Sequence, residues 1–162
     1  MEYIELFEQL QKQNIRYLIC GGLAVNIYGI PRMTADIDIL LDFEEENISR
    51  FENAMEVLEY HSSIPVSLKT MLDKDERERI IKDKNLIAYS FFNSRSEYMM
   101  LDVLIDVPFL FELMWSQREI RKQGDLVINI VSLQHLIDMK KYSDRHQDHD
   151  DVILLSKLLN HE

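Results

Sequence analysis

Two aspartates one residue apart, Asp36 and Asp38, stand in the run Asp-Ile-Asp-Ile-Leu-Leu and constrain the fold more than any other feature. Side chains alternate between the two faces of a strand, so both carboxylates share one face. Ile37, Ile39 and Leu41 then point the other way, into a core. Neighbouring acids repel each other, and a fold accepts them most readily when a cation lies between them. The run therefore predicts a strand that carries a metal site.

A glycine pair, Gly21-Gly22, precedes the aspartates and directly follows an apolar run over 15–20. The order of these segments predicts a buried strand that ends in a tight turn before a short helix. Backbone N–H groups at a strand-to-helix turn can bind phosphate oxygens. An ordinary tight turn is the alternative, and the nearby pair of aspartates favours the phosphate site.

Composition limits what the chain can be. A length of 162 residues with 46% apolar residues is typical of one domain, which we expect to span 1–162. The single cysteine, Cys20, excludes an intramolecular disulfide framework. The net charge of -11 argues against a broad nucleic-acid surface, although a local basic groove stays open. An acidic, amphipathic N-terminus and the lack of a long apolar run predict a cytoplasmic protein with no membrane partner.

The residue patterns predict an α+β (mixed α/β) fold with one central sheet, because strands and helices follow one another without regular alternation. The charged segment 71–84 is expected to be a solvated helix or loop. Helices are expected over 2–13, 23–28, 46–60, 132–143 and 147–160, and strands over 15–20, 36–41, 86–92, 98–107 and 127–131, with 86–92 and 98–107 paired.

A third acid, Asp102, lies in the middle of the apolar strand expected over 98–107. An unpaired carboxylate in that position would cost several kcal/mol, so it needs a partner. Pairing with an arginine is one solution, and action together with Asp36 and Asp38 is the one we favour. Asp106 shares the face of Asp102 but precedes Val-Pro, where a turn or cap residue is the simpler interpretation.

Lys140 lies on an otherwise apolar helical stripe near the end of the chain. A lysine there must reach solvent, pair with an acid or meet an anionic ligand. Asp148, near the start of the next helix, is on that helix's inner face and can meet it. Two interpretations stay open: a salt bridge that joins the helices, or a lysine that Asp148 orients toward a phosphate.

Three segments together resemble the nucleotidyltransferase superfamily, the DNA polymerase beta-like fold. The run from Gly21-Gly22 to Asp36-Ile37-Asp38 resembles its first motif, and Leu101-Asp102-Val103-Leu104 is similar to the strand of its third carboxylate. The segment from Lys140 through Arg145-x-x-Asp148-x-x-Asp151 resembles the closing pattern of the abortive-infection toxin-like branch. That branch includes uncharacterised nucleotidyltransferases and toxins of toxin–antitoxin pairs. The chain is shorter than many of those relatives, so a separate substrate domain is expected to be missing.

The resemblance implies a central mixed sheet flanked by helices, with a C-terminal helical pair. It implies transfer of an NMP from an NTP, dependent on Mg²⁺ or Mn²⁺, to RNA, a protein or a small molecule, with a cognate antitoxin or toxin as a further partner. The implied catalytic and metal-binding residues are Asp36, Asp38 and Asp102. The implied nucleotide-binding residues are Gly21, Gly22, Arg32, Thr34, Lys140 and Asp148.

Simpler interpretations accompany this one. A loop charge is the simpler interpretation of Arg32, with a triphosphate contact as the alternative, and Tyr28 and Met33 are expected to pack rather than to stack on a base. Two other classes of protein also fit the sequence. One is a nucleotide-binding or protein-interaction module of the same fold without turnover. The other is an unrelated acidic domain whose aspartates hold a structural metal or lie on the surface.

Overall fold

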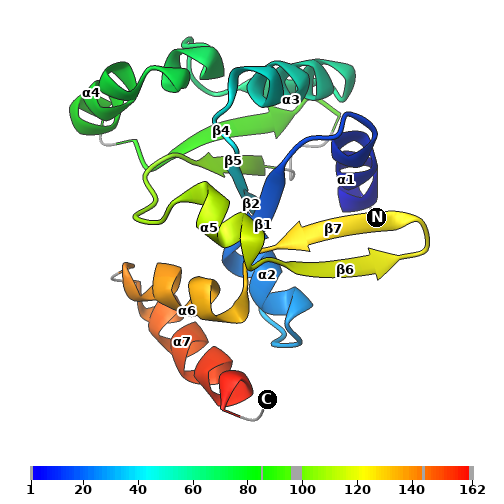
Figure 1. Cartoon of the computed structure of the whole chain (residues 1–162), viewed down its shortest axis with the longest axis vertical. Helices are drawn as coiled ribbons and strands as arrows, with labels where there is room; N and C mark the ends of the chain where they lie inside the picture. Colours follow the sequence, from blue (N-terminus) through cyan, green and yellow to red (C-terminus); the bar gives the residue numbers. More distant parts are fainter. Residues whose placement is uncertain (1, 85, 96–99, 144, 161–162) are drawn as a thin grey trace.

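The computed structural model describes residues 2–84, 86–95, 100–143 and 145–160, and its centre is a seven-stranded mixed sheet (Figure 1). The strand order is β3-β4-β5-β2-β1-β7-β6. The strands are β1 (Tyr17–Cys20), β2 (Asp36–Leu41), β3 (Tyr60–Ser62), β4 (Ala88–Asn93), β5 (Met100–Leu104), β6 (Glu119–Gln123) and β7 (Leu126–Ile130). β2 runs parallel to β5 and antiparallel to β1, so the aspartate strand lies near the middle of the sheet.

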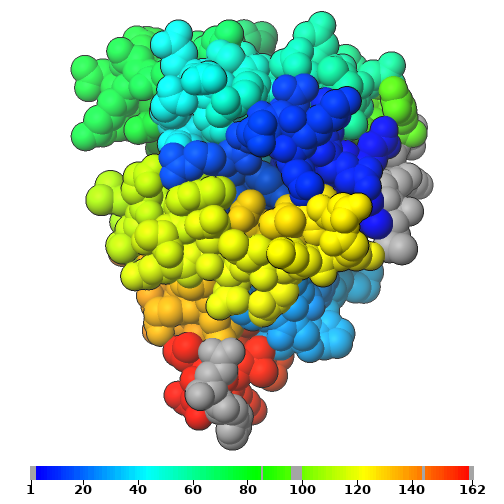
Figure 2. All heavy atoms as spheres, turned by 45° about the vertical axis from the view of Figure 1, so that its right-hand side comes forward, coloured from blue at the N-terminus to red at the C-terminus, as the bar shows by residue number. Residues whose placement is uncertain are grey.

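Seven α-helices and one 3-10 helix surround the sheet in the described residues. They are α1 (Glu2–Lys12), α2 (Gly21–Ile27), α3 (Glu45–Val57), η1 (Leu68–Leu72), α4 (Lys74–Lys84), α5 (Phe111–Ser116), α6 (Leu133–Lys141) and α7 (His146–Leu159). The last two form the expected C-terminal pair, which Figure 2 shows at the end of the molecule opposite α3 and α4. No helix within the described ranges is long and apolar enough to cross a bilayer.

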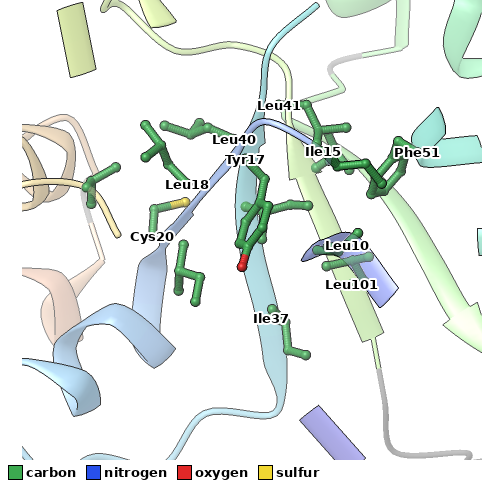
Figure 3. Packing of buried hydrophobic residues seen from close by; sticks show 14 of the residues in the cluster. Leu10, Ile15, Tyr17, Leu18, Cys20, Ile37, Leu40, Leu41, Phe51 and Leu101 are labelled. Carbon is green, nitrogen blue, oxygen red and sulfur yellow. The ribbon is translucent and has the colours of Figure 1, made fainter. Parts of the chain in front are cut away.

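One layer of the core lies on the face of the sheet opposite the aspartates, while Leu18, Cys20 and Leu40 are buried on the aspartates' own face. Ile37, Ile39 and Leu41 are buried on the opposite face, as their alternation with the acids predicts (Figure 3). Aromatic contacts fasten helices to this face: Phe7 of α1 stacks on Tyr17 with ring centroids 5.8 Å apart. Phe51 of α3 meets Phe91 of β4 edge-on at 5.6 Å. One face of β2 is therefore fixed by packing, which leaves the other face to carry the acids.

The expected strands are present, and β4 and β5 pair antiparallel as predicted. The expected helix over 46–60 is wrong at its C-terminal end, because α3 stops at Val57 and Glu59 adopts a φ of 59° before β3 begins. The segment 71–84 is mostly a solvated helix, α4. The sequence analysis missed β3, α5 and β6. Residues 96–97 of the predicted link between β4 and β5, and residues 98–99 at the start of the strand expected over 98–107, lie outside the described residues.

Candidate active site

A row of side chains that carry polar atoms crosses four neighbouring strands on the face of the sheet that bears the aspartates. Cα partners join Cys20 of β1 to Asp38 of β2, Asp38 to Asp102 of β5, and Asp102 to Ser90 of β4. Residues paired in this way point to the same face. Asp36 precedes Asp38 by two residues and shares its face. Asp102 therefore lies beside Asp38 on one face of the sheet, with Asp36 two residues along the same strand, and their joint action stays a prediction. We call Asp36, Asp38 and Asp102 the acidic row.

Each member of the acidic row influences the others electrostatically. Burial, followed by the negative charges of Asp102 and Asp36, raises the pKa of Asp38 to about 6. The N–H of Gly22, which donates to the Asp38 carboxylate, and the charge of Lys140 oppose that rise. Burial and the Asp102 charge also raise the pKa of Asp36. The row thus carries more negative charge than the groups around it neutralise.

The contacts of Asp102 also indicate a missing positive partner. Its Oδ1 atom is buried and has no hydrogen-bond partner among the described residues. The alternative interpretation is a structural arginine that pairs with Asp102, but no arginine of the described residues hydrogen-bonds this oxygen. Asp106 lies past the end of β5 and is exposed, and its interpretation as a turn or cap residue stays a prediction. A buried carboxylate oxygen without a partner is costly, so a cation from outside the chain would stabilise it.

The two glycines bring the backbone against the acidic row. Gly21 has a φ of +59°, and a Cβ added there would lie 1.8 Å from Oδ2 of Asp38. A Cβ on Gly22 would lie 2.6 Å from Oγ1 of Thr34 and 3.2 Å from Nε of Arg32. Both positions therefore require glycine, since any side chain would displace a member of the site. Phosphate binding by this turn stays a prediction, because the Gly22 N–H already donates to Asp38.

The loop between α2 and β2 holds two of the predicted residues in place. The Thr34 hydroxyl donates to the carbonyl of Asp36 at 3.1 Å, and the Arg32 N–H donates to Oδ1 of Asn26 at 2.8 Å. The Tyr28 hydroxyl donates to the carbonyl of Val131, so its packing role is confirmed. The expectation that Met33 packs is wrong, since it is 92% exposed. Its neighbours in the loop turn inward, and this leaves Met33 to face solvent.

A second group of charges joins this loop to the helices α6 and α7. Lys140 Nζ lies 2.6 Å from Oδ1 of Asp148 and 2.8 Å from Oδ2 of Asp151. Arg145 Nε lies 3.0 Å from Oδ2 of Asp148, and Arg32 Nη1 pairs with Oδ2 of Asp151. We call these five residues the charge network. The predicted pair of Lys140 with Asp148 is confirmed, and its further role in nucleotide binding stays a prediction.

The charge network differs from the acidic row in its balance. Burial alone would raise the pKa of Asp148, but hydrogen bonds from Lys140 and Ser143 and the charges of Lys140 and Arg145 lower it below its usual value. The sequence analysis missed the contact between Arg32 and Asp151. Asp151 precedes Leu155 by one helical turn, which indicates its inward direction, but no local pattern links it to a loop so far away in the chain.

The donor set of the acidic row fits a hard cation only in part. Within the described residues, no three His, Cys, Asp or Glu side chains stand together as a ready-made metal cage. Mg²⁺ commonly binds through one or two carboxylates and completes its shell with waters and substrate phosphates. Asp38 and Asp102, aligned on adjacent strands, supply such a pair, and the unpartnered Asp102 oxygen fits a cation.

No protein-family model matches the sequence, and no curated protein matches it. Solved structures do resemble it. The lincosamide antibiotic adenylyltransferase LnuA with lincomycin bound has a TM-score of 0.63 and 15% identity, covering 96% of this chain and 94% of that one. ANT(2'')-Ia in complex with adenylyl-2''-tobramycin has a TM-score of 0.60 and 13% identity, covering 97% and 87%.

The solution structure of ANT(2'')-Ia, described as an antibiotic-resistance factor, gives a TM-score of 0.58 and 14% identity, covering 97% and 82% of the two chains. At identities this low, the likeness shows the fold. The chain therefore has a nucleotidyltransferase-like fold over nearly its whole length, as the sequence analysis predicted.

Proposed function

We propose that the protein is a metal-dependent nucleotidyltransferase, which moves an NMP from an NTP to a hydroxyl of an acceptor. One observation carries the proposal: Asp38 and Asp102 are aligned on adjacent parallel strands, and a buried oxygen of Asp102 has no partner among the described residues. The raised pKa of Asp38 is consistent with a row that lacks its cation. The nucleotidyltransferase-like fold supports the same activity.

The acidic row would hold the metal, with Asp38 and Asp102 as the aligned pair and Asp36 beside them. When bound, Mg²⁺ or Mn²⁺ would neutralise charge on the triphosphate and on the departing pyrophosphate. The backbone at Gly21 lies against Asp38, so the glycine turn would adjoin phosphates that a metal at Asp38 binds.

Transfer then requires one bond to form and one to break. The acceptor oxygen bonds to the α-phosphorus, and the bond from that phosphorus to the bridging oxygen of the β-phosphate breaks, so pyrophosphate leaves. Asp102 accepts the proton of the acceptor hydroxyl. Arg32 and Lys140, at the edge of the glycine turn, bind the phosphates, with Thr34 and Asp148 holding the loop and the lysine in place.

We propose a small molecule as the acceptor. The net charge of -11 disfavours an RNA surface. Solved structures similar to this chain include one with lincomycin bound and one with adenylyl-2''-tobramycin, and this chain covers most of their length. A macromolecular acceptor in a toxin–antitoxin pair is the alternative, which the pattern from Lys140 to Asp151 supports.

Labelled NTPs test the proposal directly. The protein is incubated with each α-labelled NTP, Mg²⁺ and a small-molecule extract or a macromolecular cell extract, and the label is followed by chromatography and by gel. A labelled small molecule supports the proposal, and a labelled RNA or protein supports the toxin-like alternative. Nucleotide binding without any labelled product would identify a binding module, and no binding at all would contradict the proposal. The same assay on Asp102→Asn measures the contribution of Asp102 to transfer. Asp106→Asn, with the same chemical change on the same segment, is its matched control.

A further inference from the structure

We propose that Asp151 is a positioning residue for the nucleotide, which holds Arg32 and Lys140 together beside the glycine turn. The inference rests on the proposed function, because it assigns a role within the same site. Asp151 lies on α7, far along the chain from the motif that carries the acids.

A single carboxylate oxygen receives both cations. Oδ2 of Asp151 lies 2.8 Å from Nζ of Lys140, and Nη1 of Arg32 pairs with the same atom. Asp151 is 4% exposed and Lys140 is 6% exposed. Two like charges in a poorly solvated place repel each other, so the shared acid is what allows them to stand side by side.

The two cations also adjoin the proposed reaction site. Arg32 lies over the glycine turn, since a Cβ on Gly22 would come within 3.2 Å of its Nε atom. The helix α6, which carries Lys140, contacts α2, whose first residues are Gly21 and Gly22. Asp151 therefore fixes positive charge beside the glycine turn, where the phosphates of an NTP would lie.

The contact leaves donors for a ligand. A guanidinium has five N–H groups in a fixed fork, and an ammonium has three. Asp151 engages Arg32 through Nη1, and no hydrogen bond within the described residues involves Nη2 of Arg32. The pairing thus orients the arginine without using up its capacity to bind phosphate.

Asp148 does not share this arrangement. It pairs with Lys140 and with Arg145, whose side chain is 83% exposed, but it makes no contact with Arg32 in the described structure. Asp151 is the acid that connects the helical pair to the loop between α2 and β2. Asp150, exposed and one residue away, provides a control with the same change in charge.

Two variants separate positioning from the alternatives. Asp151→Glu keeps the charge and moves the carboxylate, while Asp151→Asn removes the charge and keeps the shape. Affinity for Mg²⁺ with ATP or GTP, affinity for the matching nucleoside, and melting temperature are measured for each variant and for Asp150→Asn. We expect both Asp151 variants to weaken NTP binding about tenfold, as for one charge-assisted hydrogen bond, with nucleoside affinity unchanged. Asp150→Asn should match the wild type.

Arg32→Gln removes the same contact from the loop, so it tests the inference even if an Asp151 variant does not fold. Its effect on NTP affinity should not add fully to that of Asp151→Glu, because both act through one contact. A lower melting temperature with intact NTP affinity would make Asp151 a structural anchor and overturn the inference. Tighter NTP binding by Asp151→Asn would show that Asp151 competes with phosphate, and would also overturn it. A wild-type protein that binds no NTP would instead refute the proposed function itself.

Discussion

The acids of the acidic row are partly buried and those of the charge network are buried, but only the network contains its own cations. In the network, Lys140 and Arg145 hold the pKa of Asp148 below its usual value against the effect of burial. In the row, burial and the neighbouring acids raise the pKa of Asp38 to about 6. Lysine and arginine side chains of the protein neutralise the acids of the charge network. The acidic row keeps an excess of negative charge, which a bound cation would neutralise.

The contrast separates structural charge from functional charge. A fully paired buried group stabilises or specifies a fold without any ligand. A group left with excess negative charge destabilises the fold, and chains retain such groups mainly at binding or catalytic sites. The acidic row is therefore the part of the molecule where removal of charge should harm function and help stability.

The largest expected effect comes from neutralising the row. Asp38→Asn should abolish nucleotidyl transfer through loss of a metal ligand, and Asp102→Asn should lower it by at least roughly 10²–10⁴-fold, the range for loss of an acid–base group. Asp36→Asn should also abolish transfer. The melting temperature should stay level or rise, because repulsion is relieved. Activity assays with circular dichroism test this, and full activity in Asp102→Asn would remove Asp102 from the mechanism.

The next largest expected effect is the loss of stability when a side chain is added beside the acidic row. Gly21→Ala should destabilise the protein by about 3 kcal/mol or more, since the new methyl overlaps the Asp38 carboxylate and the backbone φ is positive. Gly124→Ala has nearly the same φ, and a Cβ added there would meet nothing within 4 Å. It should cost about 1 kcal/mol. Denaturant unfolding of the two variants isolates the clash, and equal losses would contradict the close approach.

Removing Lys140 from the charge network tests how much this lysine stabilises the buried acids. Lys140→Met leaves Asp148 and Asp151 buried with Arg145 and Arg32 as their remaining cations, so we expect a loss of about 2–3 kcal/mol of stability. If Lys140 also contacts the triphosphate, NTP affinity falls by roughly 1.5–3 kcal/mol. Melting temperature and calorimetry on this variant measure both effects. Unchanged stability would contradict the picture of a network held together by this lysine.

The smallest effect is a pH dependence. The unfolded Asp38 carboxyl ionises near 3.8, but the folded one ionises only near 6. Wild-type stability is therefore lost as pH rises between these values, while Asp38→Asn escapes that loss. Without metal, the variant should gain about 1–2 kcal/mol over the wild type above pH 6 and nothing below about pH 4. Urea unfolding across this range measures the gap, and a gap that does not vary with pH would refute the assignment.

Local patterns predicted much of the site. Strict alternation placed β2 at Asp36–Leu41, and an acid amid apolar neighbours identified Asp102. A lysine on an apolar stripe identified the contact between Lys140 and Asp148. These predictions were possible because each of these residues is charged and stands among apolar neighbours on its own strand or helix face. Such a pattern is visible in the sequence alone.

Other features depend on tertiary structure that no local pattern encodes. β6 is a charged edge strand, Glu-Ile-Arg-Lys-Gln, which lacks apolar alternation because only its partner β7 is packed inward. β3 has three residues and exists by pairing with β4. The contact between Arg32 and Asp151 joins segments that only the folded chain brings together.

Titration calorimetry of an NTP, with and without Mg²⁺, tests the central claim most directly. If the acidic row lacks only its cation, the metal must bring the triphosphate to Asp38 and Asp102, because magnesium shares its ligands between carboxylates and phosphates. The account predicts tight binding with Mg²⁺, weak binding without it, and loss of this difference in Asp38→Asn. Equal affinity of the wild-type protein with and without metal would contradict the account.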